Sequence, residues 1–373
     1  MTAEILLPGR GKLPVPRPYW RPSYPPPRRR SVYAAAHVAA SPDGRIDWDA
    51  TLGFREYLWR YGFGVAEAMD TAQRGMGLSF EQATELIRRS AARAGELGAV
   101  IVSGAGTDQL PPGPHSVAAI IGAYTEQVEL VQSAGSQVIV VASRALSAAA
   151  CGRDDYLEVY EQVLKAAESP VLLHWLGEAF DPALRGYWGS TEIGRAADTV
   201  IEIIERAPEK VAGIKLSVLD AEAERALRRR LPAGVRLYTG DDFHYAELIK
   251  GDADGHSDAL LGAFAAITAP AAAALHALDA GDVAGYDAAI GPTVPLSQLV
   301  FAAPTQYYKV GVAFLAWLNG LQPHFAMIGG LQSRRSVEHL VRVFELAAKA
   351  GALADPDLAV GRMSAFLAGR AVP

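Results

Sequence analysis

Short apolar runs recur along the chain, and each is followed by a longer segment in which apolar residues return every three or four positions. The runs lie at residues 31–40, 64–69, 98–103, 136–142, 170–176, 211–217, 235–240 and, more weakly, 252–261. They predict buried strands, and the segments between them, such as FEQATELIRRSAARAGEL, predict amphipathic helices. Strands that alternate with helices form a parallel sheet, and eight repeats favour a closed (β/α)8 TIM barrel of the α/β class.

The same pattern divides the chain into three regions. We expect the barrel over residues 31–270, and the Ala-rich residues 271–373 predict a C-terminal helical region. Residues 1–30 predict an extended arm rich in Pro and Arg, because eight prolines between positions 8 and 27 exclude a helix or a central strand.

The composition is that of an ordinary soluble protein, with 50% hydrophobic and 20% charged residues among 373. No apolar run approaches the roughly 20 residues of a membrane helix. The N-terminus has prolines and basic residues where a secretory signal needs its apolar core, and Cys151 is the only cysteine. We therefore expect a cytoplasmic protein with no membrane partner.

The net charge of -6 is unevenly distributed, since residues 1–30 carry +6 and the remainder carries -12. A basic arm can touch nucleic acid, but the prolines leave no helix that could read a groove, so we expect no nucleic-acid partner. Tyr19, Trp20 and Tyr24 offer apolar anchors instead. We expect the arm to wrap its own body or a neighbouring subunit.

A lysine in an apolar strand is the first candidate for chemistry. In VAGIKLSVLD, alternation along a strand places Val211, Gly213 and Lys215 on one face. Lys215 lies near the carboxyl end of its strand, where barrels collect their active sites. An apolar interior disfavours the ammonium, lowers the pKa and leaves an amine that can attack a carbonyl, with Gly213 making room for its stem. On this segment alone a structural lysine is the more common case, and a Schiff-base lysine is the alternative that its place in a barrel suggests.

Three segments carry a family resemblance: SPDGRIDWDATLGFREYLWRYGFG at 41–64, GIK at 213–215 and TGDD at 239–242. In this order, from about residue 33 to residue 310, the chain resembles the dihydrodipicolinate synthase/N-acetylneuraminate lyase family of class I aldolases. The resemblance implies a TIM barrel, a Schiff base on Lys215, no cofactor, a small-molecule substrate and a homo-oligomer, either a dimer or a tetramer.

The chain departs from that family at the groups that surround the lysine. The family's G-T-T-G-E loop, which holds the substrate carboxylate, falls on residues 70–74, where only Thr71 matches. The family's proton-relaying tyrosine falls at 143–145 and is absent, and its Tyr-Asn at the end of the fifth strand reads His174-Trp175. The resemblance therefore implies a divergent branch with a rebuilt proton relay and carboxylate clamp.

Several residues are candidates for the missing roles. At the end of its strand His174 is a candidate general acid or base near neutral pH, or else a core histidine. The candidate substrate ligands are Asp70, Thr71, Arg74, Arg144, Asp241, Asp242 and His244. Each of them is equally consistent with a structural or solvated role.

The clustering of acidic and imidazole groups leaves a second enzyme class open. A metal-dependent barrel aldolase or sugar isomerase would use carboxylates and imidazoles at the mouth of the barrel. The residues available for it are Asp241, Asp242, His244, His256, Asp258, His174, Glu178, His37 and Glu67. The spacing of these residues along the chain is only a weak indication of a metal site, and we assign no metal ligand. A catalytically silent binding scaffold is a further alternative.

The sequence as a whole favours a Schiff-base-forming lyase, aldolase or dehydratase that acts on a 2-oxo acid or keto-sugar acid. The protonated imine on Lys215 would serve as the electron sink for carbon–carbon or carbon–oxygen cleavage.

Overall fold

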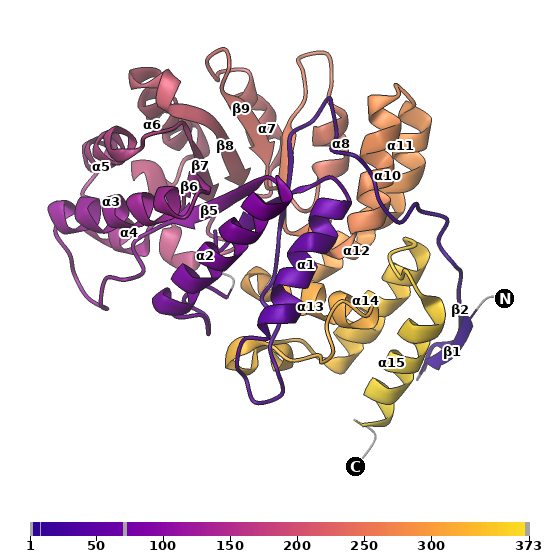
Figure 1. Ribbon diagram of the computed structural model, residues 1–373. Helices are drawn as coiled ribbons and strands as arrows, with labels where there is room; N and C mark the ends of the chain where they lie inside the picture. The colour runs from indigo at the N-terminus through magenta and orange to yellow at the C-terminus, as the bar shows by residue number, and fades with distance from the viewer. Residues whose placement is uncertain (1–2, 8, 70–72, 370–373) are drawn as a thin grey trace.

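The chain folds as a closed parallel barrel in a computed structural model that describes residues 3–7, 9–69 and 73–369 (Figure 1). The strands, in the order in which they pair around the barrel, are β3 (Val32–Ala35), β4 (Gly64–Glu67), β5 (Ile101–Ala105), β6 (Gln137–Val140), β7 (Val171–Leu176), β8 (Val211–Ser217), β9 (Arg236–Thr239) and β10 (Asp258–Leu261). All pairs are parallel, and β10 closes the barrel on β3. Each overlaps one of the eight predicted runs, and only β5 extends beyond its run, to Ala105, so the TIM-barrel prediction is confirmed.

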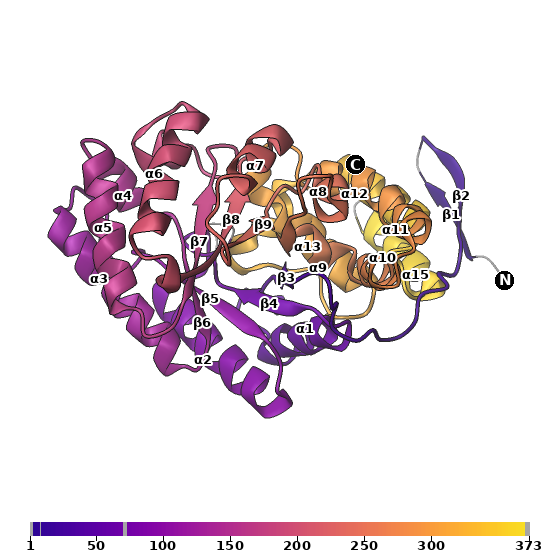
Figure 2. The ribbon, with the colours of Figure 1, turned by 90° about the horizontal axis from the view of Figure 1, so that it is seen from above.

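Helices surround the barrel between successive strands (Figure 2). They are α1 (Trp48–Arg60), α2 (Phe80–Leu97), α3 (Val117–Ser133), α4 (Arg144–Ala149), α5 (Arg153–Ala166), α6 (Ile193–Arg206), α7 (Ala221–Arg228), α8 (Tyr245–Lys250) and α9 (Ala263–Ala266). Residues at the helix ends determine where the helices begin and end. At α2, the Ser79 side chain and the Gln82 side chain cap each other's backbone N–H groups, and Gly98 ends the helix in the left-handed conformation.

The core has two main parts, because alternate residues of each strand face opposite ways, and a small third cluster includes Val38, Leu78 and Ile328. The barrel interior is filled by Tyr33, Ala35, Ala66, Met69, Val102, Ile139, Leu172, Tyr238 and Leu260. A larger cluster lies between the strands and the helices, and it contains the outward residues Ile214 and Leu216 of β8. The interior is therefore a packed core up to the level where polar side chains begin near the carboxyl ends of the strands.

An irregularity in β8 decides which of its residues face inward. The register with β7 shifts after Val211, so that Leu172 of the interior pairs with Gly213 and Ala212 is an extra residue. Ala212 packs against the interior cluster, whereas Val211 belongs to the outer core. The prediction that Val211 shares a face with Lys215 is therefore wrong, while Gly213 and Lys215 do face the same way.

The C-terminal region is helical and packs against one side of the barrel (Figure 2). It contains α10 (Thr268–Asp279), α11 (Val283–Ile290), α12 (Val294–Val300), α13 (Lys309–Leu318), α14 (Val337–Lys349) and α15 (Pro356–Ala368). Short 3-10 turns occupy Pro182–Leu184, Tyr187–Gly189, Pro208–Lys210, Gly291–Thr293, Thr305–Tyr307 and Ile328–Arg334. Helix α13 is buried almost throughout and packs against α9, at the carboxyl end of β10.

The N-terminal arm begins with a hairpin that the sequence pattern did not predict. Strand β1 (Ala3–Leu7) pairs antiparallel with β2 (Gly11–Val15), and the hairpin lies against α14 and α15. Its buried side chains are apolar, and Pro14 is tolerated because the two-stranded sheet has free edges. No helix within the described residues is long and apolar enough to cross a membrane.

Trp20 fastens the rest of the arm to the C-terminal region. Its Nε1 donates a hydrogen bond to the Gly351 carbonyl at 2.7 Å, and its ring lies so close to Gly351 that a Cβ there would approach Nε1 to 3.1 Å. Tyr19, by contrast, is 81% exposed, so it does not anchor the arm as its sequence suggested.

We expect Trp20→Ala to lower the free energy of unfolding by about 1 to 3 kcal/mol, because it removes ring packing and a hydrogen bond to a carbonyl. Tyr19→Ala is the matched control and should change that free energy by less than about 0.5 kcal/mol. Urea unfolding followed by circular dichroism measures both. Equal effects of the two substitutions would show that Trp20 does not fasten the arm.

Candidate active site

Lys215 lies inside the barrel near the carboxyl end of β8. It pairs with His174 of β7 on one side and with Tyr238 of β9 on the other, and its side chain belongs to the interior face. Only 5% of the residue is exposed. Lys215 is thus buried at the level where the barrel interior becomes polar.

Gly240, which follows β9, makes the space for the lysine stem. A Cβ at Gly240 would lie 2.6 Å from Lys215 Cε and would also collide with Ser217 Oγ. A Cβ at Gly213 would instead meet the Arg236 carbonyl at 2.6 Å, on the neighbouring strand. The prediction that Gly213 accommodates the lysine is therefore wrong, because the room comes from across the sheet and not from the same strand.

His174 and Ser217 form a polar pair beside the lysine. His174 Nε2 lies 3.3 Å from Ser217 Oγ, and both residues are buried. Burial, and after it the charge of Lys215, holds the pKa of the His174 imidazole well below its usual value. The imidazole is therefore neutral at physiological pH, which corrects the expectation that it titrates near neutrality.

Asp242 is the carboxyl group that faces this cluster. Its Oδ1 accepts a hydrogen bond from the Ala263 backbone N–H at 2.8 Å. Burial raises the pKa of the Asp242 carboxyl to about 7, although the charges of Lys215 and, more weakly, Lys309 act to lower it. The Asp242 carboxyl can therefore hold or release a proton near neutral pH.

Asp241 and His244 have a local role at the start of α8. The Asp241 carboxylate accepts from the backbone N–H of Phe243 at 2.9 Å and of His244 at 3.0 Å, and it lies 2.8 Å from His244 Nδ1. These contacts order the turn after β9. The charge of Lys215 acts on the pKa of the neighbouring Asp242.

Lys309, at the first residue of α13, brings a second cation to the mouth of the barrel. Its Nζ donates to the carbonyls of Ala35 at 2.8 Å and Ala36 at 2.9 Å, which follow β3. The residue is buried, and its charge acts on the pKa of both Asp242 and His37. Sequence reasoning missed it; the available signal was a lone lysine at the head of the otherwise apolar run KVGVAFLAWL.

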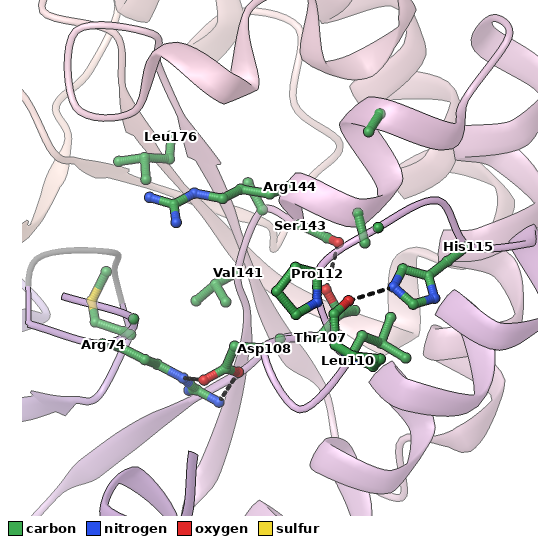
Figure 3. A pocket seen from close by; sticks show the side chains of 18 residues that line it. Arg74, Thr107, Asp108, Leu110, Pro112, His115, Val141, Ser143, Arg144 and Leu176 are labelled. Atoms are coloured by element: carbon green, nitrogen blue, oxygen red, sulfur yellow. Dashed lines mark hydrogen bonds and ion pairs between the residues drawn. The ribbon is translucent and has the colours of Figure 1, made fainter. Parts of the chain in front are cut away.

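A cavity of about 400 Å³ opens beside this cluster, between the loops that follow β5 and β6 (Figure 3). Its polar lining includes Arg74, Thr107, Asp108, Ser143 and Arg144, and the hydroxyls of Thr107 and Ser143 lie 2.6 Å apart. The wall also contains Met69, which packs within the barrel interior as well. The cavity therefore adjoins the barrel interior, although Lys215 itself does not line it.

Arg144 and Arg74 lie on opposite sides of this cavity (Figure 3). Arg144 is about half exposed and uses one N–H, on Nε, to bind Asp181 at 2.6 Å. Arg74 is buried, and all five of its N–H donors reach protein acceptors, on Asp108, Gln127 and the carbonyls of Ala68 and Gly104. This geometry favours a structural ion pair for Arg74 and leaves Arg144 as the better anion ligand.

Two of the predicted substrate ligands, Asp70 and Thr71, lie outside the described residues. The neighbouring buried pair is well defined: Arg55 of α1 binds both carboxylate oxygens of Glu67, at 2.7 and 2.9 Å. Ser90 Oγ also donates to Glu67 at 2.8 Å. The charge of Glu67 is therefore compensated by protein groups.

The residues that could bind a metal in a metal-dependent enzyme do not form one group. Asp258 is the first residue of β10 and binds Arg236 and the Ser31 N–H, at the end of the barrel opposite to Asp242. His37 bonds to Gln322 at 2.6 Å. Within residues 3–7, 9–69 and 73–369, no three His, Cys, Asp or Glu side chains are grouped so as to hold a metal ion.

Comparisons with known proteins agree with this fold. The model of a family described as "Protein of unknown function (DUF993)" matches residues 12–372. No curated protein sequence matches the chain.

Among solved structures, a dihydrodipicolinate synthase from Bacillus anthracis is similar with a TM-score of 0.65 at 16% identity, covering 86% of this chain and 97% of that one. The enzyme from Aquifex aeolicus gives 0.67 at 14%, covering 87% and 99%. A prophage protein of the dihydrodipicolinic acid synthase family from E. coli K12, solved with pyruvate, gives 0.68 at 16%, covering 86% and 99%. The resemblance stated from the sequence is thus confirmed at the level of the fold.

The raised pKa of Asp242 predicts how stability depends on pH. Between the ordinary value of 3.8 and about 7, the folded protein holds a proton that the unfolded carboxyl has lost. This carboxyl therefore makes the free energy of unfolding fall as the pH rises through that window, by an amount on the order of a few kcal/mol.

Asp242→Asn should abolish that part of the slope and keep the bond from Ala263, so its stability relative to wild type should increase from pH 5 to pH 8. The exposed Asp254→Asn is the control and should follow the wild type. Unfolding curves at several pH values test this, and identical slopes for wild type and Asp242→Asn would contradict the assignment.

Proposed function

The chain belongs to the DUF993 family, and we propose that it is a Schiff-base-forming lyase in which Lys215 reacts with the ketone of a 2-oxo acid. One feature carries the proposal: Lys215 lies buried near the carboxyl end of its strand, and its charge acts on the buried carboxyl of Asp242, whose pKa is raised to about 7 by burial. The fold adds support, because a structure of the same fold at 16% identity was solved in complex with pyruvate.

The groups around Lys215 can carry out imine formation. Lys215 first gives a proton of its ammonium to the base form of Asp242. The resulting neutral amine adds to the carbonyl carbon, and the oxygen takes a proton from the acid form of Asp242. The nitrogen then loses a proton, the hydroxyl leaves as water after a second protonation, and a protonated imine remains. Because the pKa of Asp242 is raised to about 7, both its acid and its base forms are available for these transfers.

The protonated imine then serves as the electron sink. When the bond between the carbons α and β to the imine carbon breaks, its electrons form the double bond of an enamine and the C=N electron pair moves to nitrogen. The β-hydroxyl loses its proton in the same step and becomes the carbonyl of the departing aldehyde. Reprotonation of the enamine carbon and addition of water release the 2-oxo acid and restore Lys215. The same intermediates, used in reverse, form the bond.

The His174–Ser217 pair takes the place of the missing tyrosine in this scheme. The Ser217 hydroxyl is on the same face of β8 as Lys215, two residues nearer the mouth, and His174 Nε2 lies 3.3 Å from it. A neutral imidazole can accept the hydroxyl proton or orient the hydroxyl as a donor. We assign the proton transfers at the leaving fragment to this pair.

The cavity beside the barrel interior provides room for the rest of the substrate. Its volume of about 400 Å³ suits a small molecule, and its wall is largely apolar with Arg144 at one side. A substrate with an acidic group remote from its ketone would place that group against Arg144.

We expect borohydride to trap a covalent adduct on Lys215 when the protein is incubated with pyruvate, because hydride reduces the imine to a stable amine. Mass spectrometry of the digested protein locates the adduct. Lys215→Ala should give none at this position, and Lys165→Ala, which removes an exposed lysine, should be trapped like the wild type.

An adduct on a different lysine, or no adduct across a panel of 2-oxo acids and keto sugars, would overturn this function. Exhaustive chelation should leave the trapping unchanged. Stoichiometric Zn, Mn or Fe in the purified protein together with no adduct would favour the metal-dependent alternative instead.

Arg144 should favour substrates with a remote acidic group. We expect wild type to trap 2-oxoglutarate at a lower concentration than 2-oxopentanoate, which has the same chain length without the second carboxylate. Arg144→Gln should reduce this preference by roughly 10- to 100-fold, the value of a charge-assisted hydrogen bond. Arg185→Gln, in an exposed pair with Glu178, is the control; an unchanged preference in Arg144→Gln would exclude the role.

A further inference from the structure

The cavity of about 400 Å³ between the loops after β5 and β6 has hydroxyl groups that are bonded to each other. The hydroxyl oxygens of Thr107 and Ser143 lie 2.6 Å apart, and Ser143 Oγ also accepts from the Leu146 backbone N–H at 3.0 Å. Only 7% of Thr107 and 2% of Ser143 is exposed. A hydroxyl group of a ligand would therefore have to replace one of these bonds in order to form its own.

The charged and imidazole groups of the lining are also bonded within the protein. The Asp108 carboxylate accepts from Arg74 at 2.9 and 2.7 Å and from Gln127 Nε2 at 2.8 Å, and all five N–H donors of Arg74 reach protein acceptors. His115 Nε2 lies 2.7 Å from the Pro111 carbonyl oxygen, so this ring has at most one further bond to offer, through Nδ1. These side chains leave few bonding positions for a polar ligand.

Arg144 differs from the other polar groups of the cavity. The buried Asp181 holds its Nε at 2.6 Å, and the second carboxylate oxygen of Asp181 accepts from the Ala183 N–H at 3.1 Å. In the part of the chain that the structure describes, no hydrogen bond or ion pair occupies the two terminal nitrogens of Arg144, which lies along one side of the cavity (Figure 3). Arg144 can therefore bind an anion with two parallel hydrogen bonds.

The remaining wall of the cavity is largely apolar and has few hydrogen-bond donors. Its larger side chains are those of Met69, Leu110, Pro111, Pro112, Val141 and Leu176. Two consecutive prolines also remove the backbone N–H groups that this part of the loop after β5 would otherwise present. An apolar ring or branched chain gains free energy when it is buried against such a wall, whereas a hydroxyl group loses its bonds to water without replacement.

We propose that this cavity binds an organic acid with an apolar ring or branched chain as its body, and that it rejects a polyhydroxylated body of the same size. Arg144 binds the acid group, and the apolar wall contacts the body. The connection of this cavity to the reaction rests on the proposed function, in which the cavity receives the fragment remote from the ketone. The substrate class then narrows to 2-oxo acids with an apolar body that carries a second acid group, and keto-sugar acids are excluded.

Three small probes test this specificity in the full-length protein by calorimetry. Cyclohexanecarboxylate and quinate have the same ring and the same carboxylate, but quinate has several hydroxyl groups on the ring. We expect cyclohexanecarboxylate to bind at least about tenfold more tightly than quinate. It should also bind roughly tenfold more tightly than the uncharged cyclohexanecarboxamide. Arg144→Gln should remove most of the second difference and leave the first.

Val141→Thr places a hydroxyl group on the apolar wall without changing the branched shape of the side chain. We expect it to reduce the preference for cyclohexanecarboxylate over quinate by roughly 3- to 10-fold, because the added hydroxyl weakens apolar contact and offers quinate a partner. Val283→Thr makes the same change at a position of α11 that is 47% exposed, and it should keep the wild-type preference. An unchanged preference in Val141→Thr would show that the ring binds elsewhere and would overturn the proposal.

Failure of this specificity can be distinguished from failure of the proposed function, because none of the three probes contains a ketone. Quinate that binds as tightly as cyclohexanecarboxylate, or no binding of any probe, would overturn the specificity, and a borohydride adduct on Lys215 would then leave the lyase assignment standing. The expected preference together with no adduct on Lys215 would retain the specificity of the cavity and exclude the imine chemistry.

Discussion

The carboxyl group of Asp242 is a buried ionisable group whose charge the candidate site has to compensate. Taking an ionised group out of water costs several kcal/mol unless opposite charges or hydrogen bonds compensate it. Here the charge of Lys215 comes from the barrel, the charge of Lys309 comes from the C-terminal region, and the Ala263 N–H binds one carboxyl oxygen. The proton balance of the site therefore requires both parts of the chain.

Backbone geometry positions these groups, and glycine provides the space. Pairing of β8 with β7 and β9 places Lys215 between His174 and Tyr238, so the register of three strands decides the neighbours of the amine. Gly240 permits the stem of the lysine to lie against the next strand. A methyl group at that position would collide with the side chains of both Lys215 and Ser217.

The barrel could be predicted from the sequence because its signals are local and repeated. Eight apolar runs alternate with amphipathic segments, and Lys215 stands out within one run. Lys309 could not be found in this way, because it is 94 residues further along and its contacts with Ala35 and Ala36 are made only after the C-terminal region docks on the barrel.

Other errors have physical causes of the same kind. The extra residue Ala212 in β8 breaks strict alternation, so Val211 faces away from Lys215. Asp258 begins its strand instead of ending it, which removes it from the group around Asp242. The pattern of apolar and polar residues does not show at which residue a strand begins to pair with its neighbours. This matters because the active sites of barrels lie at the carboxyl ends of the strands and not at the other end.

A crystal structure of the protein soaked with pyruvate, without reductant, tests the central claim most directly. We expect continuous electron density from Lys215 Nζ to the ketone carbon of pyruvate, as a covalent imine requires. Pyruvate bound away from an unmodified Lys215, or no bound pyruvate at all, would contradict the imine chemistry.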